Sequence, residues 1–143
     1  EKGVENYYEY IGPCHQIMIE KGHALPGEVI VGTDSHSCSY GAVGSFATGI
    51  GSTEMLGVLM MGEIWLKVPE TIRVEWSGKL NAGVMAKDIS LRTIKQIGHA
   101  GATYQTVEYV GSGISALPMD ERICIANMAV EMGAKAGLME YDE

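Results

Sequence analysis

The segment GTDSHSCSYG, residues 32–41, follows directly on the apolar run 29–31 and places six polar or thiol side chains in succession between two glycines. A polar side chain buried without a hydrogen-bond partner costs roughly 1 to 3 kcal/mol. Asp34, Ser35 and His36 therefore belong either to a solvated turn or to a reactive site. In a turn, Asp34 and Ser35 would bond local backbone N–H groups and His36 would face water.

Further polar residues could join this triplet. His15 precedes it, and Asn127 and Glu131 lie four residues apart on one face of an expected helix, among small and apolar neighbours. A carboxylate beside a histidine fixes the tautomer and orientation of the ring, which an acid or base catalyst requires. The candidate catalytic and lining residues are His15, Asp34, His36 and Glu131, with Ser35 and Asn127 lining the site.

Other chemistries fit the sequence less well. A mononuclear metal site built from His15, His36, Asp34 and Glu131 is chemically reasonable but has no spacing signature. The run 49–54 matches a dinucleotide-binding motif only loosely, and its terminal Glu54 would repel phosphate. No G-x-S-x-G elbow is present, and Ser35 and His36 would point apart on an extended strand. The remaining histidines, His23 and His99, are expected at the surface.

The elements that would position these residues alternate between helix and strand. Helices are expected over 14–20, 54–61 with Ser52 or Thr53 as N-cap, 88–97 with Asp88 as cap, and 120–132, ended by Gly133. Strands are expected over 28–32, 72–76 and 106–110, the first of them buried and parallel. This order indicates an α/β or α+β fold around one sheet. Asp34–His36 would then lie just past the carboxyl end of a strand, where open α/β sheets bind ligands.

Composition narrows the class of protein. A chain of 143 residues with 46% hydrophobic residues is long enough for one domain, 1–143, with its own core. The net charge of -8 argues against nucleic-acid binding, and no apolar run suggests a membrane span. Three widely spaced cysteines favour a reducing, cytoplasmic setting. The missing initiator methionine and the charged end suggest a piece of a longer protein.

Longer motifs extend this interpretation over nearly the whole chain. They are CHQIMIEKG, PGEVIVGTDSHSCSYGAVGSFATGIGSTE, KVPETIRVEWSGKL, AKDISLRTIKQIG, VEYVGSGI and RICIANMAVEMGAKAG. In this order they resemble the aconitase superfamily, and most closely its isopropylmalate dehydratase branch. The combination of HQ, then DSH with a glycine array, then NMxxE is specific.

The resemblance implies a three-layer α/β/α domain around a mainly parallel or mixed sheet. It implies a hydro-lyase that isomerises a hydroxy di- or tricarboxylate by removing and re-adding water at a 4Fe-4S cluster, with an iron as Lewis acid. The large subunit of such enzymes holds the cluster, and a small subunit completes the pocket. The six candidate residues fall on the family's active-site positions, with His15 expected to pair with Asp34 and His36 with Glu131.

The chain also departs from the family pattern. The cluster cysteines of the family lie in a later Cys-Thr-Asn segment and a later CxxC segment, whereas Cys14, Cys38 and Cys124 lie in neither motif. An upstream Asp-His pair, the substrate-binding arginines and a base from the other subunit are also missing. We therefore expect roughly the middle third of a large subunit, inactive and without a cluster by itself, whose partners are the small subunit and the rest of the large subunit.

The function classes left open are few. Homoaconitate, dimethylmalate and aconitate hydratases share the motifs, so the hydroxy acid that serves as substrate is not determined. A domain retained for binding or assembly without chemistry is the second hypothesis, and a mononuclear metallohydrolase is the third.

Overall fold

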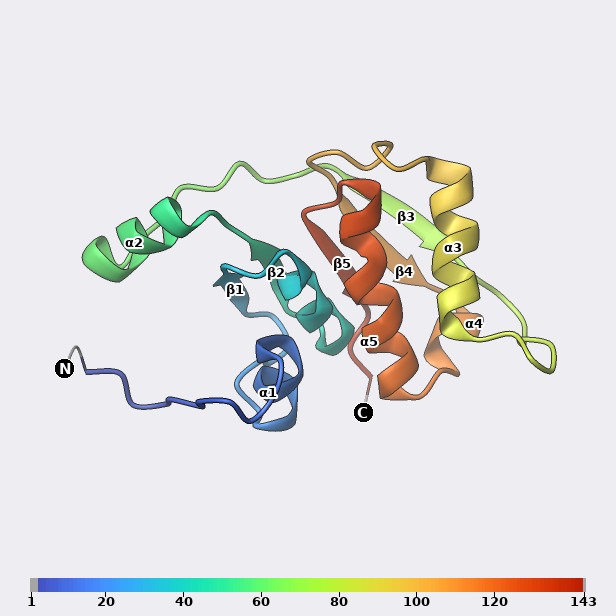
Figure 1. Cartoon of the computed structure of the whole chain (residues 1–143). Helices are drawn as coiled ribbons and strands as arrows, with labels where there is room; N and C mark the ends of the chain where they lie inside the picture. Colours follow the sequence, from blue (N-terminus) through green and yellow to red (C-terminus); the bar gives the residue numbers. More distant parts are fainter. Residues whose placement is uncertain (1–2, 143) are drawn as a thin grey trace.

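A computed structural model describes residues 3–142. Residues 3–13 form no regular element, and the elements that follow alternate between helix and strand (Figure 1). In chain order they are α1 Cys14–Glu20, β1 Val29–Gly32, the 3-10 helix η1 Ser35–Val43, β2 Phe46–Gly49, α2 Ser52–Met61, β3 Thr71–Glu75, α3 Ala86–Ile97, β4 Thr106–Val110, α4 Ser112–Ser115, α5 Met119–Asn127, the 3-10 helix η2 Met128–Met132 and β5 Ala136–Met139.

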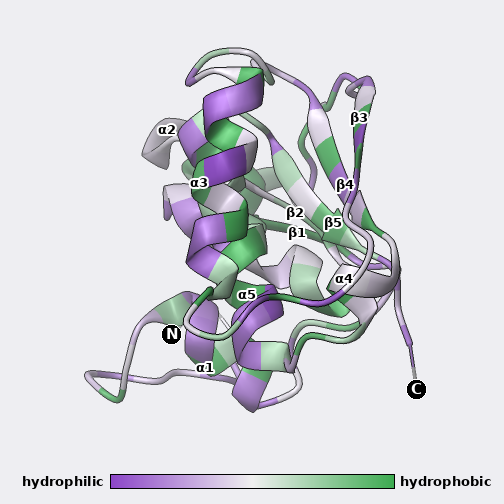
Figure 2. Cartoon of the chain, turned by 90° about the vertical axis from the view of Figure 1, so that its right-hand side faces the viewer, coloured by the Kyte–Doolittle hydropathy of each residue, from purple (hydrophilic) through white to green (hydrophobic). Residues whose placement is uncertain are grey.

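The strands form two small parallel sheets. β1 pairs with β2, and β3, β4 and β5 pair in that order. Because each crossover in the larger sheet moves to the next strand in the same direction, right-handed connections place their helices on one face. Figures 1 and 2 show α3 and α5 together on one side of β3, β4 and β5. The opposite face of β3 carries the exposed ion pair of Arg73 and Glu75.

The α/β class and the parallel strands are confirmed. The strands are divided over two sheets, however, instead of the one sheet expected, and the described helices α3 and α5 cover a single face of the larger one. The sequence analysis missed β2, which lies inside the glycine-rich run, and β5, which follows Gly133. Both have four residues and many small side chains, so their hydrophobic period is too short to recognise.

The 3-10 helix η1 joins the two sheets. It packs against β2, β5 and α5, and glycines allow the approach. A Cβ on Gly41 would overlap the carbonyl oxygen of Gly137 in β5, and a Cβ on Gly49 would lie 2.9 Å from the carbonyl oxygen of Asp34. These two glycines therefore serve the close packing of the backbone.

The main core lies between the larger sheet and its helices. Its largest fully buried side chains include Tyr109, Ile125, Met132 and Val107. A smaller cluster of Ala24, Tyr40 and Ala47 lies under β1 and α1. By contrast, α2 extends away from both sheets (Figure 1) and, with the segment after it, exposes several large apolar side chains: Leu56, Leu59, Met60, Met61, Trp65 and Val68.

Helix ends differ in detail from the sequence expectation. Ser52 and Thr53 lie inside α2, whose N-cap is Gly51, and Asp88 lies in the first turn of α3, whose N-cap is Met85. Glu54 and Asp88 reach back from these first turns and accept hydrogen bonds from the N–H groups of Gly51 (2.6 Å) and Met85 (2.9 Å). The expected helix 120–132 is α5 tightened into η2 after Asn127, and it ends at Gly133 with φ 80°. Within residues 3–142, no helix is both long and apolar enough to cross a bilayer.

Substitution of Gly41 by alanine tests the central contact. We expect Gly41→Ala to lower the free energy of unfolding by about 1 to 3 kcal/mol, because the new methyl group must displace the β5 backbone. Gly57→Ala in α2 is the matched control: its methyl group would only touch Met61, and alanine favours a helix by roughly 0.5 to 1 kcal/mol. Denaturant unfolding measures both changes, and equal effects would contradict the proposed role of Gly41.

Candidate active site

The site begins where β1 ends. Asp34 is the N-cap of η1, and its Oδ1 accepts a hydrogen bond from the backbone N–H of His36 at 2.7 Å. Ser37 Oγ donates to the Asp34 carbonyl oxygen, also at 2.7 Å. The turn interpretation is thus correct for the backbone, since Asp34 does cap a local turn. It does not describe His36, whose side chain is only 36% exposed.

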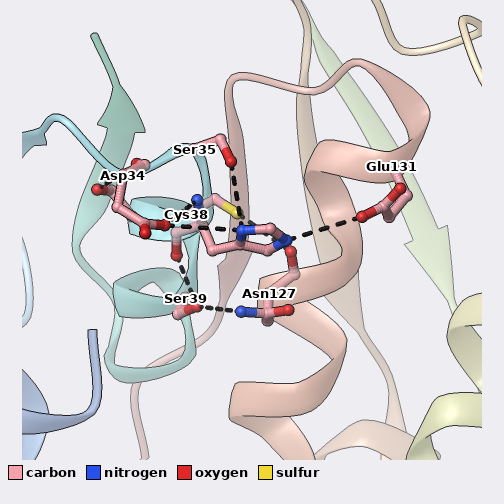
Figure 3. Close-up of polar contacts among 8 residues, drawn as sticks. Asp34, Ser35, Cys38, Ser39, Asn127 and Glu131 are labelled. Carbon is pink, nitrogen blue, oxygen red and sulfur yellow. Dashed lines mark hydrogen bonds and ion pairs between the residues drawn. The ribbon is translucent and has the colours of Figure 1, made fainter. Parts of the chain in front are cut away.

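His36 lies between two carboxylates. Its Nδ1 is 3.6 Å from Asp34 Oδ1, and its Nε2 is 3.7 Å from Glu131 Oε1 in η2. Figure 3 shows Asp34 and Glu131 on opposite sides of the site, from the end of β1 and from η2 respectively. The expected pairing of His36 with Glu131 is confirmed. These are ion-pair distances and not hydrogen bonds, and they place a carboxylate near each nitrogen of the imidazole.

Ser35 contacts the same ring. Its Oγ is 3.3 Å from His36 Nδ1 (Figure 3). The expectation that these neighbours point apart is wrong, because residues 35–43 form a 3-10 helix and not an extended strand. Ser35 is itself exposed, so its hydroxyl is accessible to a ligand that approaches the imidazole.

Asn127 holds the backbone at His36 through hydrogen bonds with Ser39 and Cys38. Its Nδ2 donates to Ser39 Oγ at 2.9 Å, and Ser39 Oγ donates to the carbonyl oxygen of His36 at 2.7 Å (Figure 3). The Cys38 thiol donates to the Asn127 carbonyl oxygen at 3.4 Å. Asn127 and Glu131 therefore both face η1, as their spacing predicts. In this structure Asn127 fixes the backbone beneath His36.

His15 lies beside this network without joining it. The ring centroids of His15 and His36 are 6.4 Å apart, and the His15 Nδ1 is buried with no hydrogen-bond partner among residues 3–142. A ring nitrogen of His15 and a carboxylate oxygen of Asp34 lie within 4.8 Å of each other. The expected pair of His15 and Asp34 is thus close but unbonded: the ion pair of Asp34 is with His36.

Two open cavities border the candidate residues. One, of about 360 Å³, is lined on one side by His15 and Gln16 of α1 and on the other by Cys124 and Asn127 of α5. The second, of about 330 Å³, lies at the carboxyl ends of β1 and β2, next to Ser35 and Lys135. Candidate residues thus line both cavities: His15 and Asn127 line the first, and Ser35 lines the second.

Buried protonated groups surround the network. Burial raises the pKa of the Cys38 thiol to about 11, so this thiol stays protonated at neutral pH. Burial also raises the pKa of Tyr40, with smaller contributions from Cys14 and Asp34, and raises that of Tyr109. The Cys38 thiol and the two tyrosine hydroxyls near the site are therefore neutral at neutral pH.

All six candidates gather in one region, which supports their grouping but does not test their roles. Sequence reasoning missed Cys14 and Ser39. Ser39 lies three residues after His36, the spacing that aligns side chains on a 3-10 helix, but the sequence does not reveal that helix. His99 is exposed as expected, whereas His23 is half-buried, with its Nε2 2.7 Å from the Tyr8 hydroxyl.

The raised pKa of Cys38 predicts a loss of stability in alkali. Between pH 9.0, where a thiol ordinarily titrates, and about 11, the folded chain keeps a proton that the unfolded chain releases. The free energy of unfolding must therefore fall as pH rises through this window, by up to about 1.4 kcal/mol per pH unit for one proton.

Denaturant unfolding at several pH values checks this slope. We expect Cys38→Ala to reduce it and Cys124→Ala to leave it unchanged, while the tyrosines retain their share. An identical slope in the two variants would show that Cys38 does not hold the proton.

The Ser39 hydroxyl provides a second test. Ser39→Ala removes the donor to His36 and the acceptor of Asn127, so we expect a loss of about 1 to 3 kcal/mol in unfolding free energy. Ser77→Ala, at an exposed serine, should change it by less than about 0.5 kcal/mol. A Ser39→Ala variant as stable as the parent chain would contradict the network.

Comparison with known proteins identifies a family. Residues 2–143 match the sequence profile of the Aconitase family (aconitate hydratase). The chain is 53% identical, over 143 residues, to the 3-isopropylmalate dehydratase large subunit of Methanoregula boonei, and 51% identical, over 144 residues, to large subunit 1 of that name in Methanopyrus kandleri. It is 49% identical to the probable methanogen homoaconitase large subunit of Methanosarcina mazei.

The matches differ in how much of each protein they cover. Each includes 100% of this chain, but only 34% of the two dehydratase subunits and 37% of the homoaconitase subunit. The chain thus spans about a third of the length of the curated relatives it matches. Since the family profile covers nearly every residue, the chain belongs to the aconitase family.

Proposed function

We propose that this chain, as a single domain, is the histidine- and carboxylate-bearing segment of a hydro-lyase large subunit. The proposed reaction interconverts 2-isopropylmalate and 3-isopropylmalate by loss and return of water. The observation that carries the proposal is His36, held between Asp34 and Glu131. The relatives named as 3-isopropylmalate dehydratase large subunits support the choice of reaction.

The chemistry of dehydration explains why such a site is useful. Loss of water from a hydroxy acid requires a proton donor for the departing hydroxyl group and an acceptor for the proton on the adjacent carbon. His36 can deliver or receive a proton at the ring edge near Ser35, and Glu131 orients the ring from the opposite nitrogen. Asp34 fixes the backbone and the ring together.

The implied 4Fe-4S cluster does not fit the cysteines of this chain. Such a cluster needs several thiolates on one site, but the thiols here are dispersed: Cys14 is exposed, Cys38 is buried against Asn127, and Cys124 is half-buried. The group of metal-ligating atoms found among residues 3–142 contains a single thiol, that of Cys14. We therefore propose that the cluster is bound by segments outside this chain.

The same proposal covers the partners. A small subunit and the rest of the large subunit would complete the pocket, since the relatives are named as large subunits and are about three times longer. We also propose a cytoplasmic location, because free thiols are typical of proteins in a reducing compartment.

A chimeric large subunit tests the function. The chain replaces the matching segment of the Methanoregula boonei dehydratase large subunit, which is combined with its own small subunit. We expect turnover of 2-isopropylmalate, followed by absorbance of the unsaturated intermediate. A folded, cluster-containing chimera without turnover would contradict the proposal and favour an assembly domain without chemistry.

Substitutions in the chimera test the role of His36. We expect His36→Gln to lower kcat by about 100-fold or more, because the proton-transfer group is lost, and Glu131→Gln to lower it less. His99→Gln is the matched control, since that histidine is exposed and outside the site. If His36→Gln turns over substrate as fast as His99→Gln, His36 is not catalytic.

A further inference from the structure

A second arrangement of ligand atoms lies beside the proton-transfer site. The Cys14 Sγ, a ring nitrogen of His15 and a carboxylate oxygen of Asp34 all lie within 4.8 Å of one another. Cys14 and His15 open α1 directly after Pro13, and Asp34 follows β1. Two segments that are 20 positions apart in the sequence thus present sulfur, nitrogen and oxygen to a common point.

We propose that Cys14, His15 and Asp34 bind a thiophilic divalent cation of the Zn²⁺ class. Thiolate, imidazole and carboxylate are the three ligand types that Zn²⁺ accepts in proteins, usually in a tetrahedron. Mg²⁺ and Ca²⁺ prefer sites made entirely of oxygen, so a thiol in the set selects against them. Three protein ligands leave the fourth position for water or a ligand.

The surroundings of these atoms favour binding. The Nδ1 atom of His15 is buried and has no hydrogen-bond partner within the described part of the chain, a state that a metal bond would relieve for a neutral ring. The carboxylate of Asp34 is already oriented by its hydrogen bond from the His36 N–H, so it needs little reorganisation. Cys14 is exposed, which gives an ion access from solvent.

The ligand set does not match that of an iron-sulfur cluster, because it offers one thiolate only. The other two cysteines are poor alternatives. The Cys38 thiol is buried and donates to Asn127, and Cys124 lies on the α5 side of the cavity that His15 lines. Cys14 is therefore the thiol that should decide metal binding.

Occupation of this site has a functional consequence, which rests on the proposed function. A cation held by His15 and Asp34 would engage the carboxylate that pairs with His36 and would place positive charge beside the His36 ring. Zn²⁺ should therefore inhibit the dehydratase reversibly. Metal binding itself does not depend on that function.

Cobalt provides a direct probe of the chain alone. Co²⁺ occupies Zn²⁺ sites, and a bound thiolate gives it a charge-transfer absorption in the near ultraviolet. We expect this band on addition of Co²⁺ to the 143-residue chain, and its loss on addition of one equivalent of Zn²⁺. The band should disappear in Cys14→Ser and persist in the matched control Cys124→Ser. Its persistence in Cys14→Ser, or its absence from the parent chain, would overturn the proposal.

Two further variants test the other ligands. His15→Gln and Asp34→Asn should each weaken Zn²⁺ binding at least tenfold in calorimetric titration, whereas His99→Gln should leave it unchanged. Circular dichroism verifies that each variant is folded, which matters most for Asp34, the cap of η1. If Asp34→Asn unfolds, His15→Gln decides alone, and unchanged affinity in that variant would overturn the assignment.

The chimeric enzyme tests the inhibition separately. Its activity is measured with and without Zn²⁺, relative to the metal-free rate of each variant. Inhibition should be at least tenfold weaker in Cys14→Ser than in Cys124→Ser, and equal inhibition would overturn the regulatory consequence. A chimera without activity that still gives the cobalt band on the chain would contradict the proposed function and leave the metal site supported.

Discussion

The close approach of two backbones, at Gly41 in η1 and Gly137 in β5, is the constraint on which the site depends. No side chain larger than hydrogen fits between them, so η1 can lie directly against β5 and α5. That position brings His36 within reach of Glu131, which is 95 positions later in the sequence. A local glycine contact thus produces the long-range pairing of an imidazole with a carboxylate.

The site also shows how a few polar groups serve both stability and chemistry. Asp34 caps η1 through its Oδ1 and pairs with the imidazole through the same atom. The Asn127 side chain donates a hydrogen bond to the Ser39 hydroxyl, which in turn donates to the carbonyl oxygen of His36. Because buried polar atoms must find partners, this arrangement restricts the residues that each position accepts. Three buried side-chain atoms have no partner among the described residues, His15 Nδ1, Ser90 Oγ and Tyr109 Oη, and of these residues His15 belongs to the inferred metal site.

The surface of the chain agrees with its proposed place in a larger subunit. The apolar side chains of α2 and the segment after it are mostly exposed, among them Leu59, Met60 and Trp65. Exposed apolar patches of this kind usually mark contact surfaces. The relatives are about three times longer, and the proposed rest of the large subunit would cover this face. Within the chain, the core between the larger sheet and α3 and α5 depends on none of these exposed side chains.

The sequence by itself determined the α/β class, the six candidate residues, and those helices and strands whose apolar residues recur at a clear spacing. Strands such as 106–110 and helices such as 14–20 were predictable because their patterns lie within a few neighbouring residues. Only the tertiary structure decided that the strands form two sheets, that residues 35–43 wind into a 3-10 helix, and that Asp34 pairs with His36 while His15 stays unbonded. Those outcomes depend on which distant segments of backbone approach closely. Such contacts leave no periodic pattern of apolar residues in the sequence, so they cannot be read from it.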